Sequence, residues 1–370
     1  MEKLDGSINK QILMKTPHYT KIHNRFQLKG YYFSADELKD IGYDFIKEGV
    51  PYEVSIGKFI MDWMDKEDHI NVKTSGSSGY PKIIQISKQA MVKSAIRTGD
   101  FFGVQIGDTA LHCLPADFIA GKMMLVRAMI LGLSLDLVQP TADPMRDLVK
   151  YYDFVAMTPM QAHHSLEKLD QIKTLIIGGA PVYPELNEKL VSLHNNCFET
   201  YGMTETITHI AASKLSVPKK PFRALDGIHL KVDKDCCLVV DAPEITDQLI
   251  HTNDLVEMHD DKTFTYLGRR DNVINSGGVK ISPEVVEQKL AHHIQFPFFL
   301  YGIQDKVLGQ KLIMVVEGDD VHVKEAEKHI AACETLEKFE VPKSLYYVSE
   351  ILRNNGKYMR AKTVKTLKIV

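Results

Sequence analysis

The order of apolar and polar positions predicts strands alternating with helices through the middle of the chain. Short apolar or β-branched runs, each of strand length, occur at residues 109–115, 134–138, 153–157, 173–177 and 197–200. Helical patterns fall between several of them, at residues 87–102, 119–131 and 184–194. Strands and helices that alternate at this spacing indicate a largely parallel sheet covered by helices, with ligands at the carboxyl ends of the strands.

The two ends of the chain have a different texture. Residues 34–38 are typical of a helix start, and residues 57–65 predict a short helix. Residues 225–267 consist of short β-rich pieces broken by Asp, Asn and Pro, and beyond Arg270 a smaller α+β pattern begins. We therefore predict an α/β protein with a large domain over residues 1–270, which contains the covered sheet and the β-rich part, and a small mobile α+β domain over residues 271–370.

Composition excludes several classes of partner. The chain has 370 residues, 44% hydrophobic and 25% charged, and a net charge of −3, which gives no electrostatic reason to expect nucleic acid or an acidic membrane. No apolar run reaches the roughly 18–20 residues that span a bilayer, and the first residues have no apolar core of a secretory signal. Five cysteines without CxxC spacing indicate no disulfide or zinc framework. We expect a reduced, cytoplasmic protein without membrane insertion, for which a homo-oligomer stays open.

A loop rich in glycine and hydroxyl groups precedes the β-branched run at residues 83–86. Its two glycines let consecutive N–H groups point into one hollow, while four hydroxyls and one ammonium add donors and positive charge. Such a loop suits the oxygens of a polyphosphate, although a flexible linker has a similar composition. The residues concerned are Thr74, Ser75, Gly76, Ser77, Ser78, Gly79 and Lys82.

Five further segments carry candidate chemistry. Residues 200–206 read Thr-Tyr-Gly-Met-Thr-Glu-Thr after a strand, where a tyrosine ring can stack on a purine and a carboxylate can meet Mg²⁺. Asp254 ends the run His-Thr-Asn-Asp, and a carboxylate is the natural acceptor for ribose hydroxyls. Taken alone, each segment would more often be an ordinary turn or surface loop. The remaining segments are the turn at residues 178–181, the run at residues 268–287 and the basic run at residues 353–360.

Taken in order, these segments resemble the core motifs of the adenylate-forming superfamily, the acyl-CoA synthetases and their relatives. The resemblance runs from Thr74 to Arg360 and implies that residues 74–82 bind the phosphates of ATP. It implies further roles for the other segments. Gly179 and Ala180 line the adenine and acyl pocket, Tyr201 and Gly202 contact adenine, Thr204 contacts the α-phosphate, Glu205 holds Mg²⁺, and Asp254 and Arg269 bind the ribose.

The same resemblance assigns the predicted small domain. Asp271 is the hinge about which that domain rotates between two half-reactions, and Gly277 and Gly278 line a tunnel for CoA. Lys357 is the adenylation lysine, which neutralises charge as the carboxylate and the α-phosphate join. The implied reaction is ATP-dependent ligation of a carboxylic acid to CoA through an acyl-adenylate, with ATP, Mg²⁺ and CoA as cofactors or co-substrates.

The chain departs from the family pattern at three places. Fewer residues precede the phosphate loop than is usual, Asn253 replaces a glycine, and Phe118 replaces a histidine that follows Leu-Pro. Because Asn tolerates a left-handed φ, we expect the turn at residue 253 to survive. The short form, and the segments at residues 125–132 and 158–161, resemble the o-succinylbenzoate–CoA ligases of menaquinone synthesis.

We predict o-succinylbenzoate as the acid, and Lys122 and Arg127 are candidates for binding its second carboxylate, near Phe118. Two alternatives stay open. One is an adenylate-forming ligase for another aryl or acyl acid, or for a carrier-protein thiol in place of CoA. The other is a nucleotide-binding module that has lost catalysis.

Overall fold

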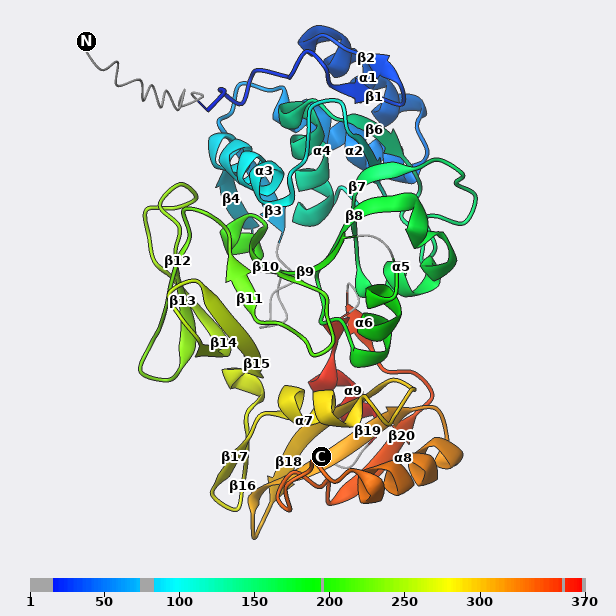
Figure 1. The fold of residues 1–370 in the computed structure, drawn as a ribbon, viewed down its shortest axis with the longest axis vertical. Helices are drawn as coiled ribbons and strands as arrows, with labels where there is room; N and C mark the ends of the chain where they lie inside the picture. Colours follow the sequence, from blue (N-terminus) through cyan, green and yellow to red (C-terminus); the bar gives the residue numbers. More distant parts are fainter. Residues whose placement is uncertain (1–15, 74–82, 194–195, 355–356, 368–370) are drawn as a thin grey trace, which may run out of the picture.

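The computed structural model describes residues 16–73, 83–193, 196–354 and 357–367 (Figure 1). The predicted phosphate loop at residues 74–82 therefore lies outside the described residues. The upper part of the molecule is built on a 13-stranded sheet, and a smaller sheet with its helices lies below it (Figure 1).

The parallel half of the large sheet contains the strands that the apolar runs predicted. Neighbouring strands in the order β1-β6-β5-β7-β8-β9 are all parallel. Their bounds are β1 Gln27–Leu28, β6 Ser134–Leu137, β5 Thr109–His112, β7 Tyr152–Met157, β8 Ile172–Ile177 and β9 Asn196–Gly202. β2 (Tyr31–Tyr32) pairs antiparallel with β1 at the edge of the sheet. This order places the carboxyl end of β9 near the middle of the sheet.

The β-rich segment continues the same sheet with antiparallel strands. Beyond β9 the order is β10-β11-β15-β14-β13-β12, so the sheet is mixed. The strands are β10 His209–Lys214, β11 Phe222–Ala224, β12 His229–Val232, β13 Cys237–Asp241, β14 Ile250–Met258 and β15 Thr263–Arg269. Because β9 joins both halves, residues of the β-rich segment can lie beside the end of a parallel strand.

Helices cover both faces of the parallel half. Alternate residues of β7 point to opposite faces: Phe154 and Ala156 belong to the core with α2, α3 and α4, whereas Val155 and Met157 pack with α5 and α6. The helices are α1 Ala35–Glu48, α2 Pro51–Trp63, α3 Lys88–Phe102, α4 Ile119–Leu131, α5 Pro159–His164 and α6 Pro184–Val191. A short 3₁₀ helix, η1 (Leu166–Gln171), follows α5. The hairpin of β3 (His69–Lys73) and β4 (Ile83–Ser87) precedes α3.

The C-terminal part has a sheet and core of its own. β19 pairs with β16, β18 and β20, and α7 and α8 pack on this sheet. The elements are β16 Ile274–Ser276, β17 Val279–Ile281, α7 Pro283–Leu290, β18 Phe298–Asp305, β19 Gly309–Glu317, α8 Asp320–Ala332 and β20 Ser344–Val348. The chain ends with a hairpin of β21 (Arg353–Asn354) and β22 (Lys357–Tyr358), then α9 (Arg360–Thr366). The predicted division at residue 271 and the mobility of the smaller part stay predictions.

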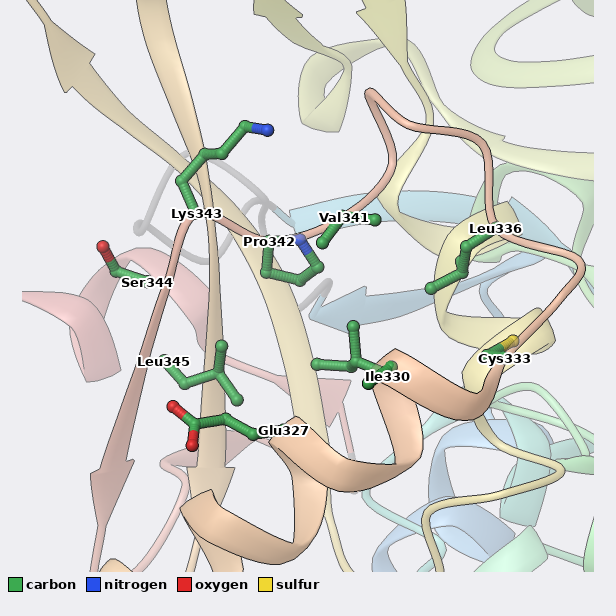
Figure 2. A pocket seen from close by; sticks show the side chains of 10 residues that line it. Glu327, Ile330, Cys333, Leu336, Val341, Pro342, Lys343, Ser344 and Leu345 are labelled. Atoms are coloured by element: carbon green, nitrogen blue, oxygen red, sulfur yellow. The ribbon is translucent and has the colours of Figure 1, made fainter.

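None of the helices in the described part of the chain is long and apolar enough to cross a bilayer. A hollow of about 490 Å³ lies between α8 and β20 (Figure 2). Its lining is mostly apolar, with Ile330, Leu336, Pro342 and Leu345 among the residues that face it. It contains no residue of the predicted active site.

Candidate active site

Tyr201 lies near the end of β9, inside a group of aromatic rings. The centroid of its ring is 5.2 Å from that of Phe264, 5.9 Å from that of Phe222 and 6.2 Å from that of Tyr266. Its hydroxyl donates a hydrogen bond of 2.5 Å to Oδ2 of Asp254. Burial, followed by the negative charge of Asp254, raises the pKa of Tyr201. The tyrosine is therefore a neutral donor with a fixed ring.

Asp254 and Arg269 face each other across the β14–β15 pair. They are register partners in this antiparallel ladder, and Nη1 of Arg269 lies 3.5 Å from Oδ1 of Asp254. Nη2 of Arg269 also donates to Oδ2 of Asp271 at 3.2 Å. The carboxylate of Asp254 is buried, whereas Arg269 is partly exposed. The fold thus joins Tyr201, Asp254 and Arg269, which the sequence pattern predicted to share one nucleotide.

A strained turn follows Gly202 and holds Thr204 and Glu205. Residues Thr204–Thr206 form a 3₁₀ turn, and Ile207 then has φ 66° and ψ −53°. The N–H of Thr208 donates to the carbonyl of Thr206 at 2.7 Å, which defines a γ-turn of the rare type. A β-branched residue at positive φ is a steric outlier, so the surrounding structure must enforce it. The turn directs the chain back into β10 beside the end of β9.

Lys357 reaches this site from the C-terminal part of the chain. β22, which carries it, belongs to the red C-terminal segment that is drawn above the lower sheet (Figure 1). The side chain is accessible to solvent, yet enough protein surrounds its ammonium that burial is the main cause of a lowered pKa. Arg269 lowers this pKa further, and the carboxylates of Asp254 and Glu205 partly offset the effect. The charges of Lys357, Arg269, Asp254 and Glu205, which lie far apart in the sequence, therefore act on one another in the folded chain.

The lowered pKa of Lys357 predicts an alkaline limit to adenylation. If the reaction needs the charged ammonium, kcat/KM should fall as pH rises through a pKa below the ordinary lysine value of 10.5. A Lys357→Arg enzyme should lose activity but show no such decline, because guanidinium stays protonated. The measurement is kcat/KM for pyrophosphate release from pH 7 upward. An identical alkaline limb in both enzymes would assign it to another group.

The predicted hinge and CoA residues occupy other positions. Asp271 lies in the 3₁₀ turn η3 (Arg270–Asn272), directly after β15. Gly277 and Gly278 form the turn between β16 and β17, with φ of 61° and 85°. Figure 1 shows this hairpin at the lower left, away from the strand that carries Lys357. Asn253 lies within β14 and does not have a positive φ, so the expectation of a left-handed turn there was wrong.

Of the two cations predicted for the acid, one already has carboxylates nearby. Lys122 is buried in α4 with its ammonium 5.1 Å from the centroid of the Phe59 ring. Burial lowers the pKa of Lys122, while the negative charges of Asp62 and Asp117 raise it. Phe118 precedes α4 and is 40% exposed. The two carboxylates therefore partly offset the burial of Lys122, although none of the described carboxylates forms an ion pair with it.

Arg127 is 2% exposed, makes no ion pair with a described residue and, unlike Lys122, has no carboxylate near enough to raise its pKa. Nη2 donates to Oγ1 of Thr208 at 2.9 Å, and Nη1 lies 3.5 Å from Sδ of Met124. Nε has no hydrogen-bond partner among the described residues. Burial alone lowers the pKa of Arg127 to about 9. Its partner Thr208 follows the γ-turn at Ile207, so a buried, uncompensated cation lies behind the segment that carries Thr204 and Glu205.

The turn at residues 178–181, predicted as a pocket wall, is held by contacts with β9. One of them comes from Glu199, which the sequence pattern did not identify. Gly179 is exposed with φ 88°, and a Cβ at Gly178 would lie 2.5 Å from Oγ1 of Thr200. The carboxylate of Glu199 accepts a hydrogen bond of 3.0 Å from the N–H of Val182 and forms an ion pair of 2.6 Å with Lys219. The only sequence signal was a charged residue in a strand two positions before Tyr201.

Removing the carboxylate of Glu199 should loosen this wall. We expect Glu199→Ala to lower kcat/KM for acid or ATP about tenfold, since a hydrogen bond to a charged group is worth roughly 1.5–3 kcal/mol. Glu199→Gln keeps an acceptor for Val182 and should retain most activity. Lys219→Ala, which removes only the ion pair, is the matched control. Equal losses in the Ala and Gln variants, at unchanged Tm, would contradict a role through the backbone contact.

Comparison with known proteins identifies the family. Residues 53–245, just over half of the chain, match the AMP-binding enzyme family. A solved acyl-CoA synthetase (AMP-forming)/AMP-acid ligase II-like protein from Dyadobacter fermentans is 35% identical, with a TM-score of 0.57 over 86% of this chain and 95% of that chain. The chain therefore belongs to the AMP-binding, adenylate-forming superfamily and is an AMP-forming acid–CoA ligase.

Two further relatives bear on the type of ligase. A 2-succinylbenzoate–CoA ligase from Bacillus cytotoxicus is 27% identical over 342 residues, which cover 80% of this chain and 69% of that protein. The o-succinylbenzoate coenzyme A synthetase of Bacillus subtilis, solved with ATP and magnesium ion, has a TM-score of 0.72 at 21% identity, covering 82% of this chain and 74% of that chain. The second likeness shows that the fold is that of the adenylate-forming enzymes.

Proposed function

We propose that this enzyme joins o-succinylbenzoate, an aromatic acid with two carboxylates, to CoA at the expense of ATP. In the first step a carboxylate oxygen attacks the α-phosphorus of ATP and pyrophosphate leaves. In the second step the thiol sulfur of CoA attacks the acyl carbon and AMP leaves. Curated relatives named 2-succinylbenzoate–CoA ligase support this choice of acid at 24–27% identity. With this substrate the enzyme serves menaquinone synthesis.

The observation that carries the choice of a dicarboxylic acid is the uncompensated guanidinium of Arg127. A buried charge without a counter-ion is costly, and in proteins such charges are normally paired. A second carboxylate on the substrate would supply the missing anion, and the planar fork of arginine matches carboxylate geometry. Lys122 is a weaker candidate because Asp62 and Asp117 already lie near it.

The nucleotide would lie against the group formed by Tyr201, Asp254 and Arg269. In this arrangement the Tyr201 ring and Gly202 lie beside the adenine, with Gly179 and Ala180 opposite. Asp254 and Arg269 bind the ribose, and residues 74–82 hold the phosphates. Thr204 donates to the α-phosphate, where Lys357 neutralises charge. Preorganised donors of this kind act on the charge that develops in the transition state.

Mg²⁺ fits this site through Glu205. The carboxylate is exposed and makes no hydrogen bond or ion pair with another described residue. No group of three or more His, Cys, Asp or Glu side chains in the described chain could hold a metal by itself. Mg²⁺ commonly binds through one or two carboxylates together with substrate phosphates, so a single carboxylate here is compatible with it. When bound, Mg²⁺ would neutralise phosphate charge.

The second step would follow a rotation of the smaller C-terminal part about Asp271. That movement would withdraw Lys357 and bring the Gly277–Gly278 turn towards the acyl group, where its lack of side chains leaves room for the pantetheine chain of CoA. The electrostatic influence of Asp254 and Glu205 on Lys357 supports an assignment of this arrangement to the first step.

A panel of acids tests the proposed substrate. The enzyme is incubated with ATP, Mg²⁺ and CoA and with o-succinylbenzoate, benzoate, malonate or a fatty acid, and pyrophosphate and thioester are measured. We expect o-succinylbenzoate to give the highest kcat/KM for both products. A higher kcat/KM for benzoate or a fatty acid would overturn the proposal. Replacement of CoA by a carrier-protein thiol in a parallel assay identifies the thiol.

A further inference from the structure

Asn253 connects the large sheet to the segment proposed as the hinge. It lies in β14, next to Asp254, and both ends of its side-chain amide are used. Nδ2 donates a hydrogen bond of 3.1 Å to Oδ2 of Asp271, and Oδ1 accepts one of 2.7 Å from Nη2 of Arg270. The residue is half-buried and has an ordinary strand conformation, so the amide is placed by the strand.

These contacts belong to a network that fixes three consecutive residues. Arg269 interacts with Asp254 at 3.5 Å and with Asp271 at 3.2 Å. Arg270 forms a second contact, of 3.1 Å, with Asp235 in the turn before β13. The surface ion pairs contribute little, because exposed charges are well solvated. Among the described residues of this network, Asn253 alone has a side chain that contacts both Arg270 and Asp271. It lies on β14, a strand of the large sheet.

We infer that Asn253 is a positioning residue that holds the hinge in the arrangement in which Lys357 faces the nucleotide site. A glycine, which Asn253 replaces in the family pattern, would leave Arg270 and Asp271 without these two hydrogen bonds. Rotation about Asp271 must change the backbone at the point where the amide is attached. Asn253 therefore favours the first half-reaction over the second. The inference rests on the domain rotation of the proposed function but not on the identity of the acid.

Amide hydrogen exchange of the free enzyme tests the two hydrogen bonds of Asn253 without any substrate. Asn253→Ala removes both hydrogen bonds, and Asn253→Asp keeps the shape but places a carboxylate against Asp271. We expect amides of residues 270–281 to exchange about tenfold faster in both variants, the factor that corresponds to roughly 1.4 kcal/mol of lost hydrogen bonding. Glu257→Ala, an exposed change on the same strand, should exchange at the wild-type rate. Wild-type exchange in Asn253→Ala would overturn the inference.

Single-turnover kinetics give a second readout, which a general loss of stability would not produce. We expect the ratio of the rate constant for thioester formation to that for adenylate formation to rise about tenfold in Asn253→Ala. An unchanged ratio overturns the proposed bias towards the first half-reaction, whatever the exchange rates are. Hydrogen exchange is measured without ATP, acid or CoA. If the enzyme does not turn over o-succinylbenzoate, the proposed substrate is refuted, but the exchange result for residues 270–281 still tests the role of Asn253.

Discussion

A Lys357→Ala enzyme is expected to form acyl-adenylate about 10²–10³ times more slowly than the wild type, the usual cost of removing one preorganised donor from a transition state. The reason is that Lys357 brings positive charge to the space bounded by Glu205, Asp254 and Arg269. The measurement is single-turnover pyrophosphate release with saturating ATP and acid.

The same variant should convert a supplied acyl-adenylate to thioester at nearly the wild-type rate, because the second step does not involve this ammonium. Lys362→Ala, an exposed lysine on α9, controls for loss of surface charge. Equal loss of both half-reactions would show that Lys357 supports the C-terminal fold. Adenylate formation at the wild-type rate would show that Lys357 has no role in the first step.

An Arg127→Met enzyme should lose its preference for a dicarboxylic acid. We expect kcat/KM for o-succinylbenzoate to fall about 10²–10³-fold, as when one partner of a buried charge pair is removed. kcat/KM for benzoate, which has no second carboxylate, should change far less. Arg127→Lys, which keeps the charge but loses the fork, should lie between the two. A parallel fall for both acids would contradict the proposed contact.

Stability separates the role of Arg127 from that of a structural residue. Because its guanidinium is buried without a counter-ion, exchange for an apolar side chain of similar length should leave Tm unchanged or raise it. Lys122→Met provides a comparison: it removes the favourable charge of the ammonium near Asp62 and Asp117, and because both carboxylates are exposed we expect only a small fall in Tm. A large fall in Tm for Arg127→Met would indicate that the arginine mainly supports the core.

The sequence pattern predicted the elements that depend on local periodicity. α4 begins and ends where apolar spacing placed it, and β7 and β8 differ by one residue from their predicted bounds. The single mixed sheet was not predicted, because the pairing of β9 with β10 and of β11 with β15 joins segments whose register no local pattern encodes. The family resemblance was found from the order of the motifs along the chain, which does not depend on knowing which strands pair.

The site was predictable only where a side chain acts through its own chemistry. Tyr201, Asp254 and Arg269 carry recognisable motifs, and the fold brings them together. Glu199 and Asn253 act through a backbone N–H and through hinge side chains, which only the three-dimensional arrangement reveals. The positive φ of Ile207 runs against residue preference, so no sequence rule could have found it.

Acid-dependent exchange of radioactive pyrophosphate into ATP, in the absence of CoA, tests most directly whether these residues form an adenylating site. We expect exchange that requires Mg²⁺ and o-succinylbenzoate and that is nearly abolished in Lys357→Ala. Binding of ATP without exchange in the presence of any carboxylic acid would contradict this expectation.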